Sequence, residues 1–132
     1  MTSLFLDTSF LIALEARDDQ YHQEAKTYWR KHTHRLVTTT YVFDEIVTFF
    51  NRWDCHDKAM EIGNALITSP SVELVQVDSE LFDKGWHLFQ QNQDKRFSLT
   101  DCISFALMRQ RKMTTALTFD HHFVQAGFQR QP

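Results

Sequence analysis

Two aspartates directly follow short apolar runs of the sequence. Asp7 ends the run Leu4–Leu6, and Asp120 follows the β-prone run Thr114–Phe119. Residues that follow the strands of an open parallel sheet converge on one crevice, and ligands usually bind there. Each aspartate could instead cap a helix or form a turn, which this residue type does well. Taken singly, both residues leave the choice between a site and a cap open.

A third acid, Glu45, lies on a predicted helix. It comes three residues after Val42 and four before Phe49, so it flanks the apolar face of that helix, whereas Asp44 projects to the other side. A carboxylate at the edge of a core needs a partner. Its structural alternative is an ion pair with a residue such as Arg52.

A fourth acid, Asp101, follows Ser98 by three residues, which resembles a capping box at a helix start. The helix that it opens is apolar on nearly every side from Cys102 to Met108. A helix with that pattern is buried, so the acid in its first turn is expected near the core and at the sheet's crevice. This position favours a role beyond capping.

These four acids together predict a metal site. A low-dielectric crevice does not tolerate four carboxylates unless cations neutralise them. Oxygen-only ligands select hard ions, so we expect Mg²⁺, with Mn²⁺ as a possible substitute. The predicted ligands and catalytic acids are Asp7, Glu45, Asp101 and Asp120.

The stretch LTFDHHF raises a different metal hypothesis, because Asp120 is followed by two histidines. Adjacent residues after a strand point in different directions, so His121 and His122 are not expected to bind one ion together with Asp120. Imidazole is also the wrong ligand type for a hard ion. We therefore expect Asp120 to be the functional residue of this stretch, and His121 to be exposed and replaceable.

The elements that must position these acids alternate between strands and helices. Hardly any hairpin signal occurs, so the pattern indicates a parallel sheet covered on both faces, an α/β fold with three α/β/α layers. The predicted strands are Leu4–Leu6, Leu36–Thr39, Val72–Val77 and Thr114–Phe119. Helices are expected over Phe10–Leu14, over Asp18–His32, around Val42–Phe50, around Ala59–Leu66 up to Pro70, after an Asp78 or Ser79 cap, over Leu99–Arg111 and, as a short helix or turn, before Gly127.

Length and composition set outer limits. The chain has 132 residues, 42% of them hydrophobic and twelve of them Phe, which suits one domain over residues 1–132 with its own core. Two cysteines without a CxxC partner and the lack of a leader pattern lead us to expect a reduced, cytoplasmic setting. No apolar run approaches the ~20 residues of a membrane span. The net charge of −3 lacks the basic excess that is typical of nucleic-acid-binding proteins.

Four segments together resemble a known family. LFLDTSFLIAL, DEIVTFF, FSLTDCISFALM and ALTFDHHF occur in the order and rough spacing of PIN-domain ribonucleases, most closely the VapC-like toxins of toxin–antitoxin pairs. The resemblance implies a central, mostly parallel sheet of four to five strands and a metal-dependent endoribonuclease site. It maps the family's acids onto Asp7, Glu45, Asp101 and Asp120. It also assigns the hydroxyl of Thr8, with Ser9 beside it, to orienting Asp7 or a metal-bound water. His122 and Phe123 match the family's recurring Asp-x-His-Phe, which implies that they shape and pack the turn.

The resemblance further implies RNA as substrate, products with 5′-phosphate and 3′-hydroxyl ends, a cognate antitoxin protein as partner, and a possible homodimer. Because only FQRQP follows Gly127, any last edge strand is expected to be short. An alternative is a non-catalytic RNA-binding or regulatory module with the same fold. A third possibility is a phosphatase with an aspartyl nucleophile. Such an enzyme would need a second acid two residues after Asp7, but the residue at that position is Ser9.

Other residues have weaker claims to a role. Two basic clusters could contact phosphates, although charges at helix ends are usually solvated; they are Arg30, Lys31 and Arg35, and Arg109, Arg111 and Lys112. The aromatics Tyr21, Tyr28 and Trp29 could form a partner surface or pack on the sheet. The groups Trp53, Cys55 and His56, and His32 with His34, lack metal-ligand spacing and are expected on the surface or in packing.

Overall fold

A five-stranded sheet, parallel throughout, forms the middle of the computed structural model, which describes residues 2–132. The strands lie in the order β3-β2-β1-β4-β5, with β1 at the centre between β2 and β4. Their bounds are Ser3–Leu6 for β1, Arg35–Thr39 for β2, Val72–Val75 for β3, Thr115–Leu117 for β4 and Gln129–Gln131 for β5. The predicted fold class is confirmed, and the last edge strand is short as expected.

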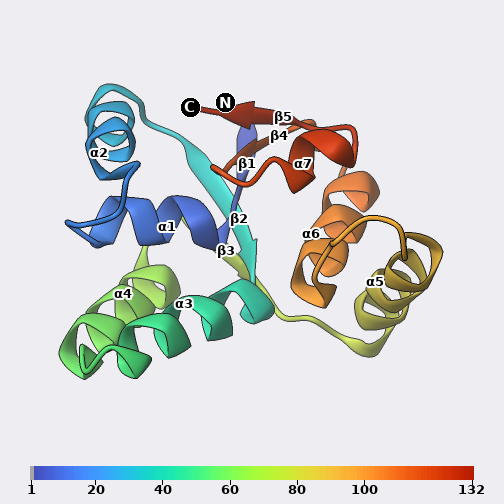
Figure 1. The fold of residues 1–132 in the computed structure, drawn as a ribbon, viewed down its shortest axis with the longest axis horizontal. Helices are drawn as coiled ribbons and strands as arrows, with labels where there is room; N and C mark the ends of the chain where they lie inside the picture. The colour runs from blue at the N-terminus through green and yellow to red at the C-terminus, as the bar shows by residue number, and fades with distance from the viewer. Residues whose placement is uncertain (1) are drawn as a thin grey trace.

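Seven helices cover the two faces of this sheet (Figure 1). On one side lie α1 (Thr8–Glu15), α2 (His22–Lys31), α3 (Thr40–Arg52) and α4 (His56–Thr68); on the other lie α5 (Ser79–Gln91), α6 (Leu99–Gln110) and α7 (His122–Gln125). The three-layer α/β/α prediction is therefore confirmed.

Within residues 2–132, none of the helices is both long enough and apolar enough to cross a membrane.

Alternating side chains of β1 supply both halves of the core. Leu4 and Leu6 pack with the apolar faces of α1 to α4, whereas Phe5 between them packs with α5, α6 and α7. Successive residues of a strand point to opposite faces of the sheet, which explains this division. A strand that is buried on both faces reads as a continuous apolar run, as Leu4–Leu6 does.

The predicted helix over Asp18–His32 is too long at its start. α2 begins at His22, because the segment before it forms a turn held by Asp19. The Asp19 side chain accepts a hydrogen bond from the backbone N of Tyr21 at 2.8 Å, and its carbonyl accepts one from His22 N at 3.0 Å. Aspartate side chains commonly stabilise turns in this way. The strand over Val72–Val77 likewise ends early, at Val75, and the strand over Thr114–Phe119 spans only β4.

Strand register and helix packing place the segments that carry the acids. Leu6 of β1 is paired with Leu117 of β4, so the residues after both strands leave the sheet side by side. Asp7 N continues this pairing by donating to Leu117 O at 3.1 Å. On the other side of the sheet, a Cβ at Gly85 would lie 2.4 Å from Cγ1 of Ile103, so only glycine lets α5 approach α6 this closely.

Candidate metal centre

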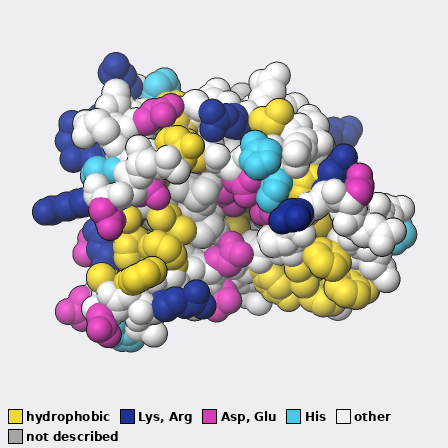
Figure 2. Space-filling model, in the orientation of Figure 1, with side chains coloured by type: hydrophobic (Ala, Val, Ile, Leu, Met, Phe, Trp, Pro, Cys, Tyr) yellow, Lys and Arg dark blue, Asp and Glu magenta, His cyan; other side chains and the backbone are white. Residues whose placement is uncertain are grey.

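The four predicted acids lie around the carboxyl ends of the paired strands β1 and β4. Among the described residues, Asp101 and Asp120 form a group of possible metal ligands with His122, and Asp7 and Glu45 lie outside that group. Asp7 follows β1, Asp120 follows β4, Glu45 lies in α3 and Asp101 in the first turn of α6. Their charges raise one another's pKa: Asp7 that of Glu45, Asp120 that of Asp7, and both Asp7 and Asp120 that of Asp101. Figure 2 shows acidic side chains gathered in a central hollow with histidines beside them.

Asp7 is both the N-cap of α1 and a buried acid, 4% exposed. Its Oδ2 accepts hydrogen bonds from Ser9 N at 3.3 Å, from Ser9 Oγ at 2.7 Å and from Thr118 Oγ1 at 2.8 Å. Burial raises the pKa of this carboxyl, and these three hydrogen bonds oppose the rise. All the hydrogen bonds to the side chain within residues 2–132 fall on Oδ2, which leaves Oδ1 for another ligand.

Asp101 forms the predicted capping box and also faces the other acids. Its Oδ2 accepts from Ser98 N at 3.1 Å, while Ser98 Oγ accepts from Asp101 N at 3.0 Å. The same Oδ2 lies 3.3 Å from Nδ1 of His122. Burial and the charges of Asp7 and Asp120 raise the pKa of this carboxyl to about 6. The capping and site interpretations of Asp101 are therefore compatible.

His122 lies between two of the acids. Its backbone N donates to Asp120 Oδ1 at 2.9 Å, and its Nδ1 lies 3.3 Å from that same oxygen. The ring also packs edge-on against Phe97, with centroids 5.5 Å apart. Asp101, Asp120 and His122 each offer one atom within 4.8 Å of the others. Besides shaping the turn as expected, this histidine contacts the carboxylates, while His121 is exposed.

The hydroxyl groups after Asp7 have different partners from those expected. Thr8 Oγ1 donates to Glu45 Oε1 at 2.7 Å, whereas Ser9 holds Asp7. Burial raises the pKa of Glu45, and the nearby hydroxyls of Thr8 and Thr100 lower it. Within the described chain, Glu45 forms no ion pair with Arg52. Ser9 therefore holds Asp7, and Thr8 positions the helix-borne acid; that Thr8 orients a metal-bound water stays a prediction.

Sequence reasoning missed Thr118. This fully buried residue donates from Oγ1 to Asp7 Oδ2 at 2.8 Å and accepts from Asp120 N at 2.9 Å. It therefore links the two acids that follow adjacent strands. The available signal was a hydroxyl residue at the end of an apolar strand, two positions before a candidate acid.

The donor set fits a hard divalent cation. Asp7, Asp101 and Asp120 each use one oxygen, Oδ2, Oδ2 and Oδ1 respectively, for the hydrogen bonds that hold them. Over residues 2–132, no Lys or Arg forms an ion pair with these three or with Glu45. The remaining carboxylate oxygens are ligands of the type that Mg²⁺ or Mn²⁺ prefers.

Two of the weaker candidates, Arg111 and Tyr28, are engaged in structure. Arg111 forms a two-pronged ion pair with Glu73 of β3, with both N···O distances 2.7 Å, so it is not a free phosphate contact. Tyr28 is buried and stacks on His32 at 4.1 Å between ring centroids, and its hydroxyl contacts His34 at 2.8 Å. This aromatic is a packing residue.

Tyr21 and Trp29 remain partly exposed, at 38% and 45%. The Tyr21 ring stacks on Phe119 with centroids 4.5 Å apart, close to the segment that carries Asp120. The three residues expected on the surface around the α3–α4 turn, Trp53, Cys55 and His56, are all exposed. None of them lies in the group of possible metal ligands among the described residues.

Comparison with known proteins gives a consistent result. The profile of the PIN domain family matches residues 4–129. The 23S rRNA-specific endonuclease VapC20 of Mycobacterium tuberculosis is 32% identical over 125 residues, which are 95% of each chain, in both strain CDC 1551 / Oshkosh and strain H37Rv.

Solved structures extend the match to three dimensions. The crystal structure of Mycobacterium tuberculosis VapC20, described as a sarcin-ricin loop cleaving toxin, has a TM-score of 0.88 at 31% identity and covers 95% of both chains. The DNA-bound VapBC complex from Salmonella typhimurium has a TM-score of 0.70 at 12% identity, with 99% of this chain and 98% of that chain covered. At that identity the second likeness concerns the fold alone.

Proposed function

Because the chain belongs to the PIN domain family, we propose that it is a Mg²⁺-dependent endoribonuclease whose site is the acid cluster around Asp7. The observation that carries the proposal is the arrangement of three aspartates, each held by one oxygen, with no Lys or Arg paired to them among residues 2–132. The similarity to VapC20, an endonuclease specific for 23S rRNA, supports RNA as the substrate class.

Asp7, Asp101 and Asp120 would hold the ion, and Glu45 would complete the cluster. When bound, Mg²⁺ supplies positive charge to the scissile phosphate and makes the attacking water more acidic. Mn²⁺ has the same preference for oxygen ligands and should substitute.

The protein's own groups prepare this chemistry. Ser9 and Thr118 fix Asp7 Oδ2, so the other oxygen points at a defined place without further ordering cost. Glu45, oriented by Thr8 and with its pKa raised by burial, is suited to accept a proton from water. His122 keeps the carboxylates of Asp101 and Asp120 at a fixed separation.

Metal-dependent cleavage has a signature that tests the proposal. The purified chain, freed of any bound partner, should cut 23S rRNA with Mg²⁺ or Mn²⁺, stop cutting with a chelator, and leave 5′-phosphate and 3′-hydroxyl ends. An Asp7→Asn variant should not cut, because the replacement removes the charge but preserves the N-cap. Binding of RNA without metal and without cleavage would instead favour the non-catalytic module.

We also propose a toxin role with a cognate antitoxin, on the basis of the likeness to the VapC20 toxin. The exposed aromatics Tyr21 and Trp29 on the α1–α2 side offer a surface for that partner. Expression of the chain alone should arrest growth, and co-expression of a small protein encoded directly upstream should restore it. We further propose that the chain forms a homodimer, which a measurement of its molar mass in solution would test.

A further inference from the structure

A pocket beside the acid cluster has the chemistry of a nucleotide subsite. It lies between the C-terminal end of α5 and the loop that leads to Ser98, the cap of α6, and its volume is about 550 Å³. The lining combines aromatic rings, side-chain amides and two cations: Trp86, Phe89, Gln90, Asn92, Gln93, Lys95, Arg96 and Phe97.

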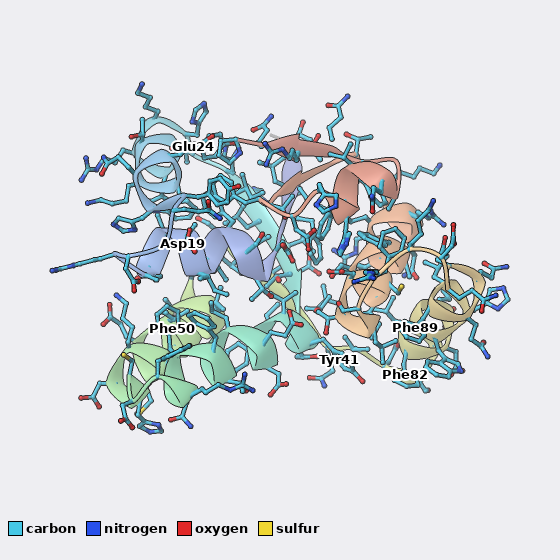
Figure 3. The ribbon with its side chains drawn as sticks, in the orientation of Figure 1. Asp19, Glu24, Tyr41, Phe50, Phe82 and Phe89 are labelled. Atoms are coloured by element: carbon cyan, nitrogen blue, oxygen red, sulfur yellow. The ribbon has the colours of Figure 1, made fainter. Side chains whose placement is uncertain are left out.

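The aromatic part of this pocket is a stacked, half-exposed pair. The Trp86 and Phe89 rings have centroids 5.5 Å apart and planes 11° apart, and the two residues are 45% and 39% exposed. In Figure 2 the hydrophobic atoms over α5 form a broad patch, and Figure 3 labels Phe82 and Phe89 on that helix. Exposed rings of this kind bind bases of single-stranded RNA by stacking, whatever the sequence.

Charge distinguishes this pocket from four other pockets of the protein. Four further pockets are each lined by at least one carboxylate, namely Glu15, Glu61, Asp18, Asp78 or Glu80, whereas this lining contains Lys95 and Arg96 and no acid. Lys95 is paired with the neighbouring Asp94 at 3.5 Å. Arg96 is exposed and forms no ion pair with any residue from 2 to 132, so it is the better phosphate contact.

The pocket adjoins the metal centre through Phe97. This ring lines the pocket and packs on His122, with centroids 5.5 Å apart. His122 in turn contacts the carboxylates of Asp101 and Asp120. An RNA strand that passes through the acid cluster would therefore reach Trp86 and Arg96 with its neighbouring nucleotides.

We propose that Trp86 and Phe89 stack a base of the RNA strand next to the cleaved bond, while Arg96 binds a phosphate of the same strand. The inference rests on the proposed nuclease function and adds to it a place where unpaired RNA is held. It predicts that the substrate is single-stranded or splayed open at this position, because a base within a duplex cannot stack on a side chain.

Steady-state cleavage of a single-stranded RNA oligonucleotide tests the aromatic part. Trp86→Leu keeps an apolar side chain but loses the π-face, so KM should rise about tenfold with kcat nearly unchanged. Trp86→Phe should restore most of the affinity. Trp53→Leu, at a more exposed tryptophan on the far end of α3, is the matched control and should behave like the unaltered protein.

Salt dependence tests the cation. Arg96→Gln should reduce the slope of log(kcat/KM) against log salt concentration by about 0.7, the value for one phosphate contact on a single strand. Photo-crosslinking of 5-iodouridine RNA to the Asp7→Asn variant, which does not depend on cleavage, should label the peptide that contains Trp86 and Phe89.

An unchanged KM in Trp86→Leu, or crosslinks confined to other helices, would overturn the inference while RNA cleavage by the unaltered protein stands. A loss of affinity that accompanies a change from dimer to monomer in Trp86→Leu would also overturn it, because the aromatic face would then be a protein interface. Failure of the unaltered protein to cut any RNA with Mg²⁺ would instead refute the proposed function.

Discussion

Oγ1 of Thr118 donates to Oδ2 of Asp7 at 2.8 Å, across 111 positions of sequence. The contact exists because β1 and β4 are paired in the register that sets Leu6 opposite Leu117. It joins the ends of the two central strands at the point where the acids converge. The hydroxyl of a buried threonine thus acts together with Ser9 to fix the position of this carboxylate.

Thr118→Val tests this contact with a side chain of similar shape. The change removes one hydrogen bond to a buried carboxylate and one acceptor for Asp120 N. We expect RNA cleavage to fall at least tenfold, and the free energy of unfolding to drop by about 1–3 kcal/mol. Thr48→Val, at an exposed threonine of α3, is the control and should change neither quantity.

Asp101 makes the stability of the metal-free protein depend on pH. Its pKa is raised from 3.8 to about 6 in the folded chain, so between these values the unfolded state loses the proton first. Stability from this group therefore falls as pH rises from about 4 to 6, and the loss persists at higher pH. It amounts to about 3 kcal/mol.

Thermal unfolding in a chelator at pH 4.5 and 7.5 measures this effect. Asp101→Asn should raise the Tm of the metal-free protein at pH 7.5 by several degrees and flatten the pH dependence. Mg²⁺ should raise the Tm of the unaltered protein more at pH 7.5 than at pH 4.5, because ligands must be deprotonated. Equal pH dependence of Tm in both proteins would show that ionisation of Asp101 does not cause the loss of stability.

Glu45 and Asp44 are neighbouring acids with opposite orientations on α3. Glu45 is half-buried and accepts a hydrogen bond from Thr8, whereas Asp44 is exposed. Glu45→Gln should therefore reduce kcat by at least about 10²-fold, as expected for loss of a proton acceptor, while Asp44→Asn should leave it within a factor of two. Similar losses in both variants would mean that general negative charge, and not the position of Glu45, matters.

His122 is expected to support the site through its contacts with Asp101 and Asp120. His122→Ala should lower cleavage about 10- to 100-fold and weaken Mg²⁺ binding, measured by calorimetry. The control is His56→Ala, at an exposed histidine whose ring forms a hydrogen bond with Asn51. Unchanged metal affinity in His122→Ala would restrict this residue to packing on Phe97.

The acids could be predicted from sequence because each stands at a position that the local pattern marks. Asp7 and Asp120 follow apolar strands, and Asp101 opens a helix that is apolar on nearly all sides. Convergence after parallel strands then follows from the fold class. The capping box of Asp101 was equally visible, and the structure shows it together with the contact to His122.

The partners of these acids could not be predicted in the same way. Thr118 meets Asp7 through strand register, and Thr8 meets Glu45 through the crossing of α1 and α3. Both depend on tertiary packing, which residue spacing does not encode. The start of α2 was missed for a local reason, since the turn formed by Asp19 competes with helix over the same polar residues.

The central claim is that a carboxylate cluster, and not the two adjacent histidines, performs the cleavage. Rates of RNA cleavage with Mg²⁺ for Asp120→Asn and His121→Ala test it at neighbouring positions, because Asp120 belongs to the cluster and His121 is exposed. We predict a loss of at least about 10³-fold for Asp120→Asn and an almost unchanged rate for His121→Ala. Full activity in Asp120→Asn, or a comparable loss in His121→Ala, would contradict the assignment.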